Sequence, residues 1–333
     1  MVESWAAAPS STSARQAAQQ AWVETVLLWQ EAELMQVGPA GSSGAVGRRT
    51  GGRDLRDEIY YWPFANPCRV DQELVRNQFE GEGFFDSALP NVYGLDALEY
   101  LLFSESTSSA CPPQADILQN GGWAGLGEQL TQRRADFAAA VSVRLADDAE
   151  RLRDAWTTGF RDGFVSAGQA GSPYRSAQAA IDEVFAAMYY IELRTIDLKL
   201  GAPPGLNQRC LRPTCPEQIE SQYAGVARRA ILRNMQGFAK MFFGGERSDP
   251  SAIGFDDYLT AAGAGPLAAD MSARLEAAIV DNDMLRVTAL TSGCADPRHS
   301  GCRHGGHVGG QGAQDRRARH HGPGRWPRGR GCR

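Results

Sequence analysis

Histidine is absent from this chain of 333 residues until position 299. A His-based zinc site, a Ser-His-Asp triad and a Cys-His pair all need imidazole, so none of them is expected in the body of the chain. A metal ion held there would have to be bound by carboxylates, carbonyls and water. Such hard oxygen ligands favour Ca²⁺, Mg²⁺, Mn²⁺ or ferric iron over zinc.

Lysine is scarce, and long apolar runs are missing. Of the 34 basic residues only Lys199 and Lys240 are lysines. No run of about eighteen apolar residues occurs, so no membrane-spanning segment is predicted. The net charge is −5, but nine arginines and two aspartates from Ala295 onward give +7 there, which leaves −12 on the rest. An acidic body without a basic stripe argues against nucleic acid as a partner.

Residues 291–333 differ in composition from the rest. They contain no Leu, Ile, Met, Phe or Tyr and are rich in Gly, Arg and His. Because such a segment buries too little apolar surface to offset the entropy of ordering, we expect it to be disordered. A frameshift in the gene is one explanation. The alternative is a zinc cluster, whose ligands would be Cys294, His299, Cys302, His304 and His307.

Two carboxylates stand in an otherwise apolar run at residues 90–103. Leu95, Leu98 and Leu101 recur at helical spacing, which predicts a helix over 95–104. The separation of three places Asp96 and Glu99 one turn apart on the same face. Buried carboxylates need a counter-ion, hydrogen bonds or a metal. The pair is therefore interpreted either as a structural ion-pair feature or as a binding site.

The run from Gly94 to Phe103 resembles the Gly-x-His-x-x-Glu helix of imelysin-like proteins, a family that includes an insulin-cleaving metallopeptidase and iron-regulated envelope proteins. The resemblance extends over about residues 15–290 in the right order. Its other segments are Trp29 to Glu33 with Gly38-Pro39, the Trp62-Pro63 pair, Lys199 to Gly205, Glu220-Ser221, Asn234 to Gly237, and Phe243 to Gly245. Asp96 stands where the family motif has histidine, which weighs against a zinc peptidase.

The resemblance implies a cleft between two related helical bundles, lined by Asp96, Glu99, Glu220 and Ser221. Glu33 is a further candidate ligand, although an isolated helix carboxylate commonly faces water. Glu220 could equally stabilise a helix N-terminus through the helix dipole. Trp29 and Trp62 are expected in the core. Arg194 is a candidate counter-ion for a buried carboxylate.

The cysteines suggest an oxidising compartment. Cys210 and Cys215 close a short loop, and Cys68 with Cys111 would form a plausible second pair; free buried thiols are the alternative. Disulfides would imply the periplasm or cell envelope, which the family resemblance also implies. The first residues lack the basic start and apolar core of a signal peptide, so the signal would have been removed, or the start codon assigned too late.

Helical periodicity dominates the body, and an all-α fold of two related bundles is predicted. The expected helices cover residues 14–37, 70–79, 95–104, 126–158, 176–200, 217–243 and 266–287. The first bundle would span 14–167 and the second 168–290, divided at a Gly/Ser/Pro-rich turn.

The sequence therefore predicts an imelysin-like envelope protein that binds a metal ion, divalent or ferric, or a metal-bearing small ligand, with a role in iron uptake. One alternative is a metallopeptidase that acts on a protein substrate. The other is a purely structural helical module.

Overall fold

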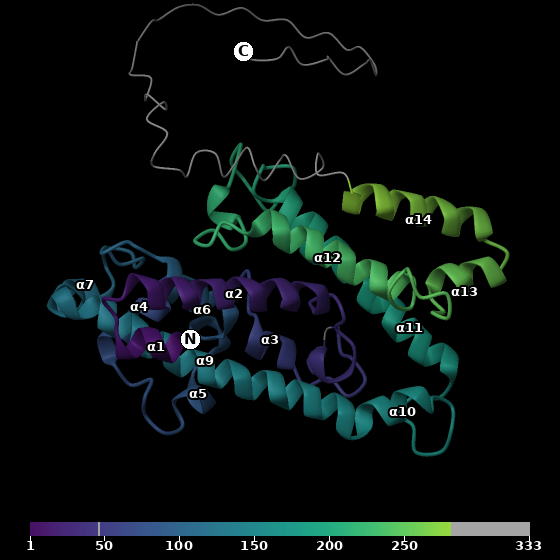
Figure 1. The fold of residues 1–333 in the computed structure, drawn as a ribbon, viewed down its shortest axis with the longest axis horizontal. Coiled ribbons are helices and arrows are strands. Elements are labelled where there is room, and N and C mark those ends of the chain that lie inside the picture. The colour runs from purple at the N-terminus through teal and green to yellow at the C-terminus, as the bar shows by residue number, and fades with distance from the viewer. Residues whose placement is uncertain (46, 281–333) are drawn as a thin grey trace, which may run out of the picture. The chain divides into compact units, whose positions relative to one another are not determined.

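The computed structural model describes residues 1–45 and 47–280, and throughout them every regular element is a helix (Figure 1). The prediction of an all-α fold is confirmed. The α-helices are α1 (Val2–Ala7), α2 (Thr12–Ala32), α3 (Leu55–Ile59), α4 (Pro67–Arg76), α5 (Phe84–Ser87), α6 (Gly94–Phe103), α7 (Asp116–Gln119), α8 (Gly122–Leu126), α9 (Leu130–Ala155), α10 (Arg161–Val165), α11 (Ala177–Met188), α12 (Ala227–Phe242), α13 (Phe255–Ala261) and α14 (Gly265–Val280). Between them lie the 3₁₀-helices η1 (Gly38–Ala40), η2 (Pro90–Val92), η3 (Gly127–Gln129) and η6 (Pro216–Gln218), and the π-helices η4 (Trp156–Phe160) and η5 (Ile191–Gly201).

Helix α6, which carries Asp96 and Glu99, is fixed at both ends by other parts of the chain. At its start Gly94 has φ +86°, and a Cβ there would lie 2.9 Å from the carbonyl oxygen of Ile59, so glycine is required. Along its length the indole N–H of Trp22 in α2 donates to the carbonyl of Leu95 at 2.7 Å. At its end Gln19 donates to the carbonyl of Leu102 at 2.9 Å, one of the groups that a helix C-terminus leaves unpaired. These contacts hold α6 in one orientation.

Two clusters of apolar side chains form the interior. The larger one joins α1, α2, α4, α6 and α9 and includes Trp22, Leu101 and Phe137, all nearly inaccessible to solvent. The smaller one lies around Phe242 at the end of α12, together with side chains of α11, α13 and α14. The prediction of two bundles, divided near residue 168, stays a prediction.

Helix α12 packs directly on α2 at Gly237. A Cβ at this position would lie 2.1 Å from the carbonyl oxygen of Glu31, so the two backbones approach as closely as glycine permits.

Replacing Gly237 by alanine should therefore lower the free energy of unfolding by about 1–3 kcal/mol, because the helices must separate. Gly125 in α8 is the control. A Cβ there meets nothing within 4 Å, and its alanine variant should gain about 0.5–1 kcal/mol. Urea unfolding of both variants checks this, and equal effects would contradict the proposed close packing.

Three predicted helices differ from the observed ones. The first was expected to reach Val37 but ends at Ala32. The segment expected as one helix over 176–200 is divided into α11 and the π-helix η5. The helix expected from residue 217 starts only at Ala227, because Ser221 (φ +49°) and Gly225 (φ +67°) take left-handed conformations that a right-handed helix cannot contain. Glu220 and Ser221 thus lie in a loop, not at a helix start.

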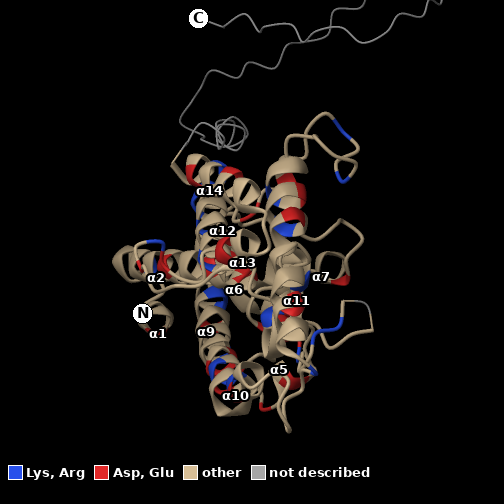
Figure 2. Ribbon diagram, turned by 90° about the vertical axis from the view of Figure 1, so that its right-hand side faces the viewer, with Lys and Arg blue, Asp and Glu red and all other residues tan. Residues whose placement is uncertain are grey.

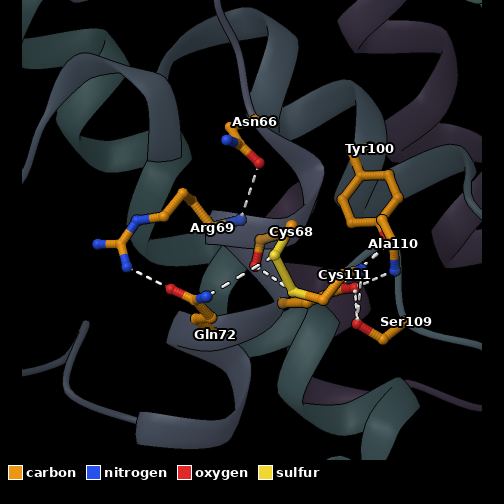
Figure 3. Close-up of a disulfide and its surroundings, with 9 residues drawn as sticks. Asn66, Cys68, Arg69, Gln72, Tyr100, Ser109, Ala110 and Cys111 are labelled. Atoms are coloured by element: carbon orange, nitrogen blue, oxygen red, sulfur yellow. Dashed lines mark hydrogen bonds between the residues drawn. A yellow bond between two sulfur atoms is a disulfide. The ribbon is translucent and has the colours of Figure 1, made fainter. Parts of the chain in front are cut away.

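Both expected disulfides are present, Cys68–Cys111 and Cys210–Cys215. The first joins the start of α4 to the loop that follows α6 (Figure 3). Beside it the buried carboxylate of Asp71 accepts hydrogen bonds from the hydroxyls of Tyr100 (2.9 Å) and Ser109 (2.8 Å). The bridge and this carboxylate tie the loop to α4 and α6.

In the described part of the chain no helix is long and apolar enough to cross a membrane. Figure 2 shows acidic and basic residues interspersed along the helices, and α9 carries both signs in its own sequence. The predictions made for residues 291–333, including the zinc cluster of Cys294, His299, Cys302, His304 and His307, lie outside the described residues.

Candidate functional site

A pocket of about 160 Å³ lies beside the acidic face of α6. Its walls come from residues 62–70, from α6 and from residues 217–223, which are far apart in the sequence. Asp96, Glu99 and Ser221 line it, together with Trp62 and Tyr223. The structure therefore brings three of the predicted site residues into one pocket.

Asp96 and Glu99 are buried, with 7% and 5% of their surfaces exposed. One oxygen of Asp96, Oδ1, accepts the backbone N–H of Tyr61 at 3.2 Å. The other, Oδ2, has no hydrogen-bond partner among the described residues. Glu99 Oε1 accepts two backbone N–H groups, those of Tyr223 and Ala224, at 2.9 Å each. Neither carboxylate has a cation as its direct partner in the described part of the chain.

Burial changes the protonation of this pair. It raises the pKa of Asp96 to about 7, although backbone hydrogen bonds act in the opposite direction. Burial likewise raises the pKa of Glu99 to about 8, and the charges of Asp96 and Glu220 add to the increase. At neutral pH Glu99 therefore largely keeps its proton. A cation in the pocket would favour the ionised forms and displace the protons.

Ser221 lines this pocket, whereas its neighbour Glu220, also predicted there, does not line it and lies in the buried interior. Glu220 Oε1 accepts the hydroxyl of Tyr60 at 2.5 Å and the amide of Gln30 at 3.1 Å. Within the described residues its second oxygen, Oε2, and the hydroxyl of Ser221 are both buried without a partner. Burial raises the pKa of Glu220, although the nearby Lys199 lowers it.

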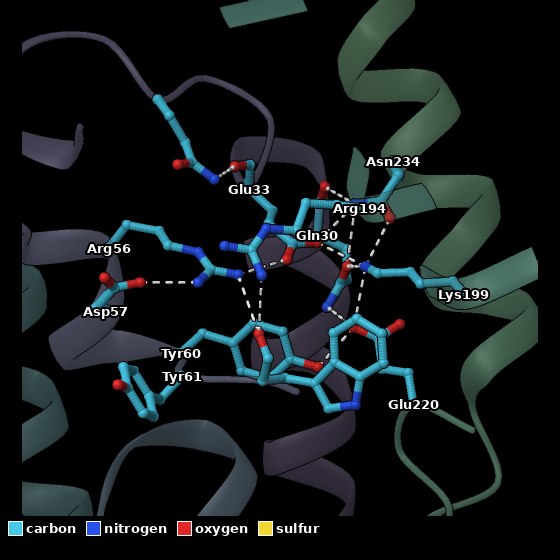
Figure 4. Close-up of polar contacts among 12 residues, drawn as sticks. Gln30, Glu33, Arg56, Asp57, Tyr60, Tyr61, Arg194, Lys199, Glu220 and Asn234 are labelled. Atoms are coloured by element: carbon cyan, nitrogen blue, oxygen red, sulfur yellow. Dashed lines mark hydrogen bonds and ion pairs between the residues drawn. The ribbon is translucent and has the colours of Figure 1, made fainter. Parts of the chain in front are cut away.

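Next to the pocket lies a buried polar network centred on Lys199 (Figure 4). The Lys199 ammonium group lies 2.6 Å from Glu33 Oε2 and 2.9 Å from Glu220 Oε1. It also donates to the side-chain oxygens of Gln30 at 2.6 Å and Asn234 at 2.7 Å. Lys199 is 2% exposed and both glutamates are 1% exposed or less, so the ammonium group and its two carboxylate partners are all buried.

Glu33 lies in this network and does not line the pocket. Its second oxygen, Oε1, pairs with Arg56 at 2.9 Å, and Arg56 also pairs with Asp57 at 2.8 Å. Burial alone would raise the pKa of Glu33, but the charges of Lys199 and Arg56 outweigh it and lower the pKa to about 2. Arg194, the candidate counter-ion, donates to the backbone carbonyl of Trp62 at 3.3 Å, and its charge also contributes to lowering the pKa of Glu33. The direct counter-ions of Glu33 are Lys199 and Arg56.

The residues predicted to support the motif lie in different parts of the structure. Gly38 has φ +56° and begins η1 with Pro39, directly after the segment that follows α2. Trp62 is 9% exposed and, with Pro63, lines the pocket, whereas Trp29 is half-buried and lines a different cavity. Trp62 was expected in the core and does join the larger apolar cluster.

The sequence did not predict that Lys199, Arg56 and Tyr60 contact the candidate site residues Glu33 and Glu220. Lys199 carried a usable signal, because it is one of two lysines in the chain and begins a family-like segment. Arg56 and Tyr60 carried none, since the chain has many arginines and nothing local links residues 56–60 to residue 220.

The described residues contain no group of three or more His, Cys, Asp or Glu side chains arranged to hold one metal ion. The predicted ligands in the pocket are two carboxylates and one hydroxyl, and Glu217, which pairs with Arg212, also lines it. Ca²⁺ takes six to eight oxygen ligands, and Mg²⁺ keeps several waters when protein ligands are few. These residues therefore fit a hydrated ion, or an ion that arrives with its own ligands, better than a bare ion.

Two comparisons with known proteins bear on the family and on the fold. The Imelysin family model, a peptidase family, matches residues 2–297. The crystal structure of an iron-regulated protein A precursor from Parabacteroides distasonis is similar with a TM-score of 0.54. The two chains are 16% identical, and the match covers 89% of this chain and 83% of that one, which supports the fold. No curated protein matches the sequence.

Proposed function

Because the chain belongs to the imelysin family, we propose that it is an envelope protein that binds a metal ion, or a small ligand carrying one, at Asp96 and Glu99. The observation that carries this proposal is the set of buried acceptor oxygens. Asp96 Oδ2, Glu220 Oε2 and Ser221 Oγ lack a partner among the described residues. A buried unpaired polar atom costs about 1–3 kcal/mol, and a cation would satisfy such atoms.

Ferric iron is the first ion to test. The similar protein from Parabacteroides distasonis is named for iron regulation, and carboxylate oxygens suit hard cations. Asp96 and Glu99 would hold the ion, and Ser221 would contribute its hydroxyl. Because the described residues supply few donors, the remaining coordination would come from water or from a small chelating ligand, which agrees with a role in the uptake of iron in complexed form.

Calorimetry and elemental analysis of the full chain test this proposal. At pH 8 we expect near-stoichiometric binding of Fe³⁺ supplied as its citrate complex, or of Ca²⁺ or Mn²⁺. An Asp96→Ala/Glu99→Ala variant should bind more than about 100-fold more weakly, since outer-shell partners alone account for about 10–100-fold. Binding should weaken at pH 6, where the carboxyls keep their protons.

The matched control is Asp147→Ala/Glu150→Ala. These two carboxylates have the same types and the same spacing of three on α9, but they are exposed to solvent. This variant should bind as the unchanged chain does. Equal binding by the Asp96→Ala/Glu99→Ala variant would place the metal elsewhere in the chain, and no binding by any variant would leave the structural module as the function.

Peptide hydrolysis is the second candidate, because pKa values of about 7 and 8 suit a general acid or base near neutral pH. Cleavage of an unfolded protein substrate by the metal-loaded chain, lost in the Asp96→Ala/Glu99→Ala variant, would support it. Replacing Asp96 by histidine restores the family motif and should shift metal preference toward zinc, since imidazole is a borderline ligand.

A further inference from the structure

A second cavity, of about 440 Å³, is lined by Glu33 and Arg56 of the buried network and shares no lining residue with the Asp96 pocket. It is bounded by the end of α2 and the segment after it, by α9, η4 and α10, and by α11 and α12. None of Asp96, Glu99 and Ser221 lines it. Its volume is in the range of about 300–1,000 Å³ that small-molecule sites occupy.

The walls of this cavity are mostly apolar. Met35, Val37, Leu152, Trp156, Phe164 and Val184 contribute to them. A neighbouring cavity of about 420 Å³ shares Phe164, Val184 and Met241, so the apolar surface continues past these three side chains. Apolar and aromatic walls of this kind suit an apolar ligand, whose transfer from water is favourable.

Two N–H donors in the lining lack acceptors. Arg56 is 3% exposed, and its Nε–H has no hydrogen-bond partner among the described residues. The indole Nε1–H of Trp29 is likewise buried without one, within the same described part of the chain. Since buried donors are nearly always paired, these two point to an acceptor atom that the protein itself does not provide.

The two charged side chains that line the cavity, Glu33 and Arg56, already have ionic partners. Glu33 is paired with Arg56 and Lys199, and Arg56 is also paired with Asp57. An added carboxylate would therefore be buried beside the charge of Glu33 and would compete with Glu33 and Asp57 for Arg56, at a high cost in desolvation. A neutral acceptor such as a carbonyl oxygen avoids that cost.

We propose that this cavity is a second binding site, independent of the Asp96 pocket, for a neutral and mostly apolar molecule that carries a carbonyl-type acceptor. Trp29 and Arg56 donate to the acceptor, and the apolar walls enclose the rest of the ligand. This site does not depend on metal binding.

Titration of the full chain with Prodan, a neutral naphthalene ketone that fluoresces more strongly and at shorter wavelength in apolar surroundings, tests the proposal. We expect saturable binding. The anionic probe anilinonaphthalene sulfonate should bind at least tenfold more weakly. Trp29→Phe keeps an aromatic ring but removes the donor, so it should weaken Prodan binding about threefold to tenfold, the value of one hydrogen bond.

Val184→Trp fills the cavity and should weaken Prodan binding more than tenfold. Val143→Trp is its control, because Val143 is 51% exposed on α9 and lines none of these cavities. Asp96→Asn/Glu99→Gln should leave Prodan binding unchanged, which separates this proposal from the metal site. Circular dichroism verifies that each variant folds. If Val184→Trp does not fold, Trp29→Phe decides.

Three results would overturn the proposal. They are the absence of saturable Prodan binding, unchanged affinity in the folded Val184→Trp and Trp29→Phe variants, and tighter binding of the anionic probe than of Prodan.

Discussion

Replacing Lys199 by methionine should lower the free energy of unfolding by about 3–5 kcal/mol, the usual cost of removing one partner of a buried ion pair. The ammonium group lies between Glu33 and Glu220, at 2.6 and 2.9 Å, and all three side chains are almost fully buried. Without it, Glu220 loses its only direct cation among the described residues, and Glu33 keeps only Arg56. Urea unfolding with the disulfides intact measures the change.

Lys240→Met is the matched control, since it replaces the only other lysine. Lys240 pairs with Glu31 and Glu246, but its side chain is 36% exposed. Exposed ion pairs contribute about 0–1 kcal/mol, so this variant should change stability little. A loss of similar size in both variants would show that Lys199 does not hold the interior charges together.

The unfolding free energy of the metal-free chain should fall as pH rises from 5 to 9. In the folded protein Asp96 has a pKa of about 7 and Glu99 of about 8, compared with 3.8 and 4.5 as ordinary values. Between the unfolded and folded values the folded state binds more protons, so raising the pH favours unfolding. The stabilisation is complete below about pH 4 and is lost as pH rises through 7–8. About three pH units correspond to roughly 4 kcal/mol for each carboxyl.

Asp96→Asn/Glu99→Gln should remove most of this slope, because each amide imitates the neutral carboxyl and does not titrate. Glu33 acts in the opposite direction, since its pKa is lowered to about 2, but its contribution is lost only as pH falls below about 4.5. Over pH 5 to 9 Glu33 therefore adds no opposing slope. Burial also raises the pKa of Glu220 and of Asp71, so the difference in slope between the unchanged chain and the variant measures the Asp96 and Glu99 pair. Equal slopes for the unchanged chain and the variant would contradict the burial of these protons. Added Fe³⁺ or Ca²⁺ should restore stability at high pH in the unchanged chain alone.

Features that depend on residues close together in the sequence could be predicted. Contacts between side chains far apart in the sequence could not. Helix α6 and the shared face of Asp96 and Glu99 follow from spacing within ten residues, and both disulfides were expected from cysteine positions. The contact between Lys199 and Glu33 joins residues 166 positions apart, and no periodicity reports such a pairing.

The prediction of a helix at Glu220 and Ser221 was wrong for a different reason. Gly225 takes a left-handed conformation that glycine readily adopts, but Ser221 takes one too, and its residue type gives no sign of it. Residue types at the site were therefore easier to predict than the backbone that presents them.

The two hydrogen bonds that Glu99 accepts from the backbone of Tyr223 and Ala224 have a kinetic consequence. A carboxylate holds N–H groups more strongly than a neutral carboxyl does. Loss of the Glu99 proton thus tightens the loop against α6, and its return loosens the same loop. The exchange rates of these two amide protons with solvent accordingly record whether the pocket is charged, without any probe attached to the ligand.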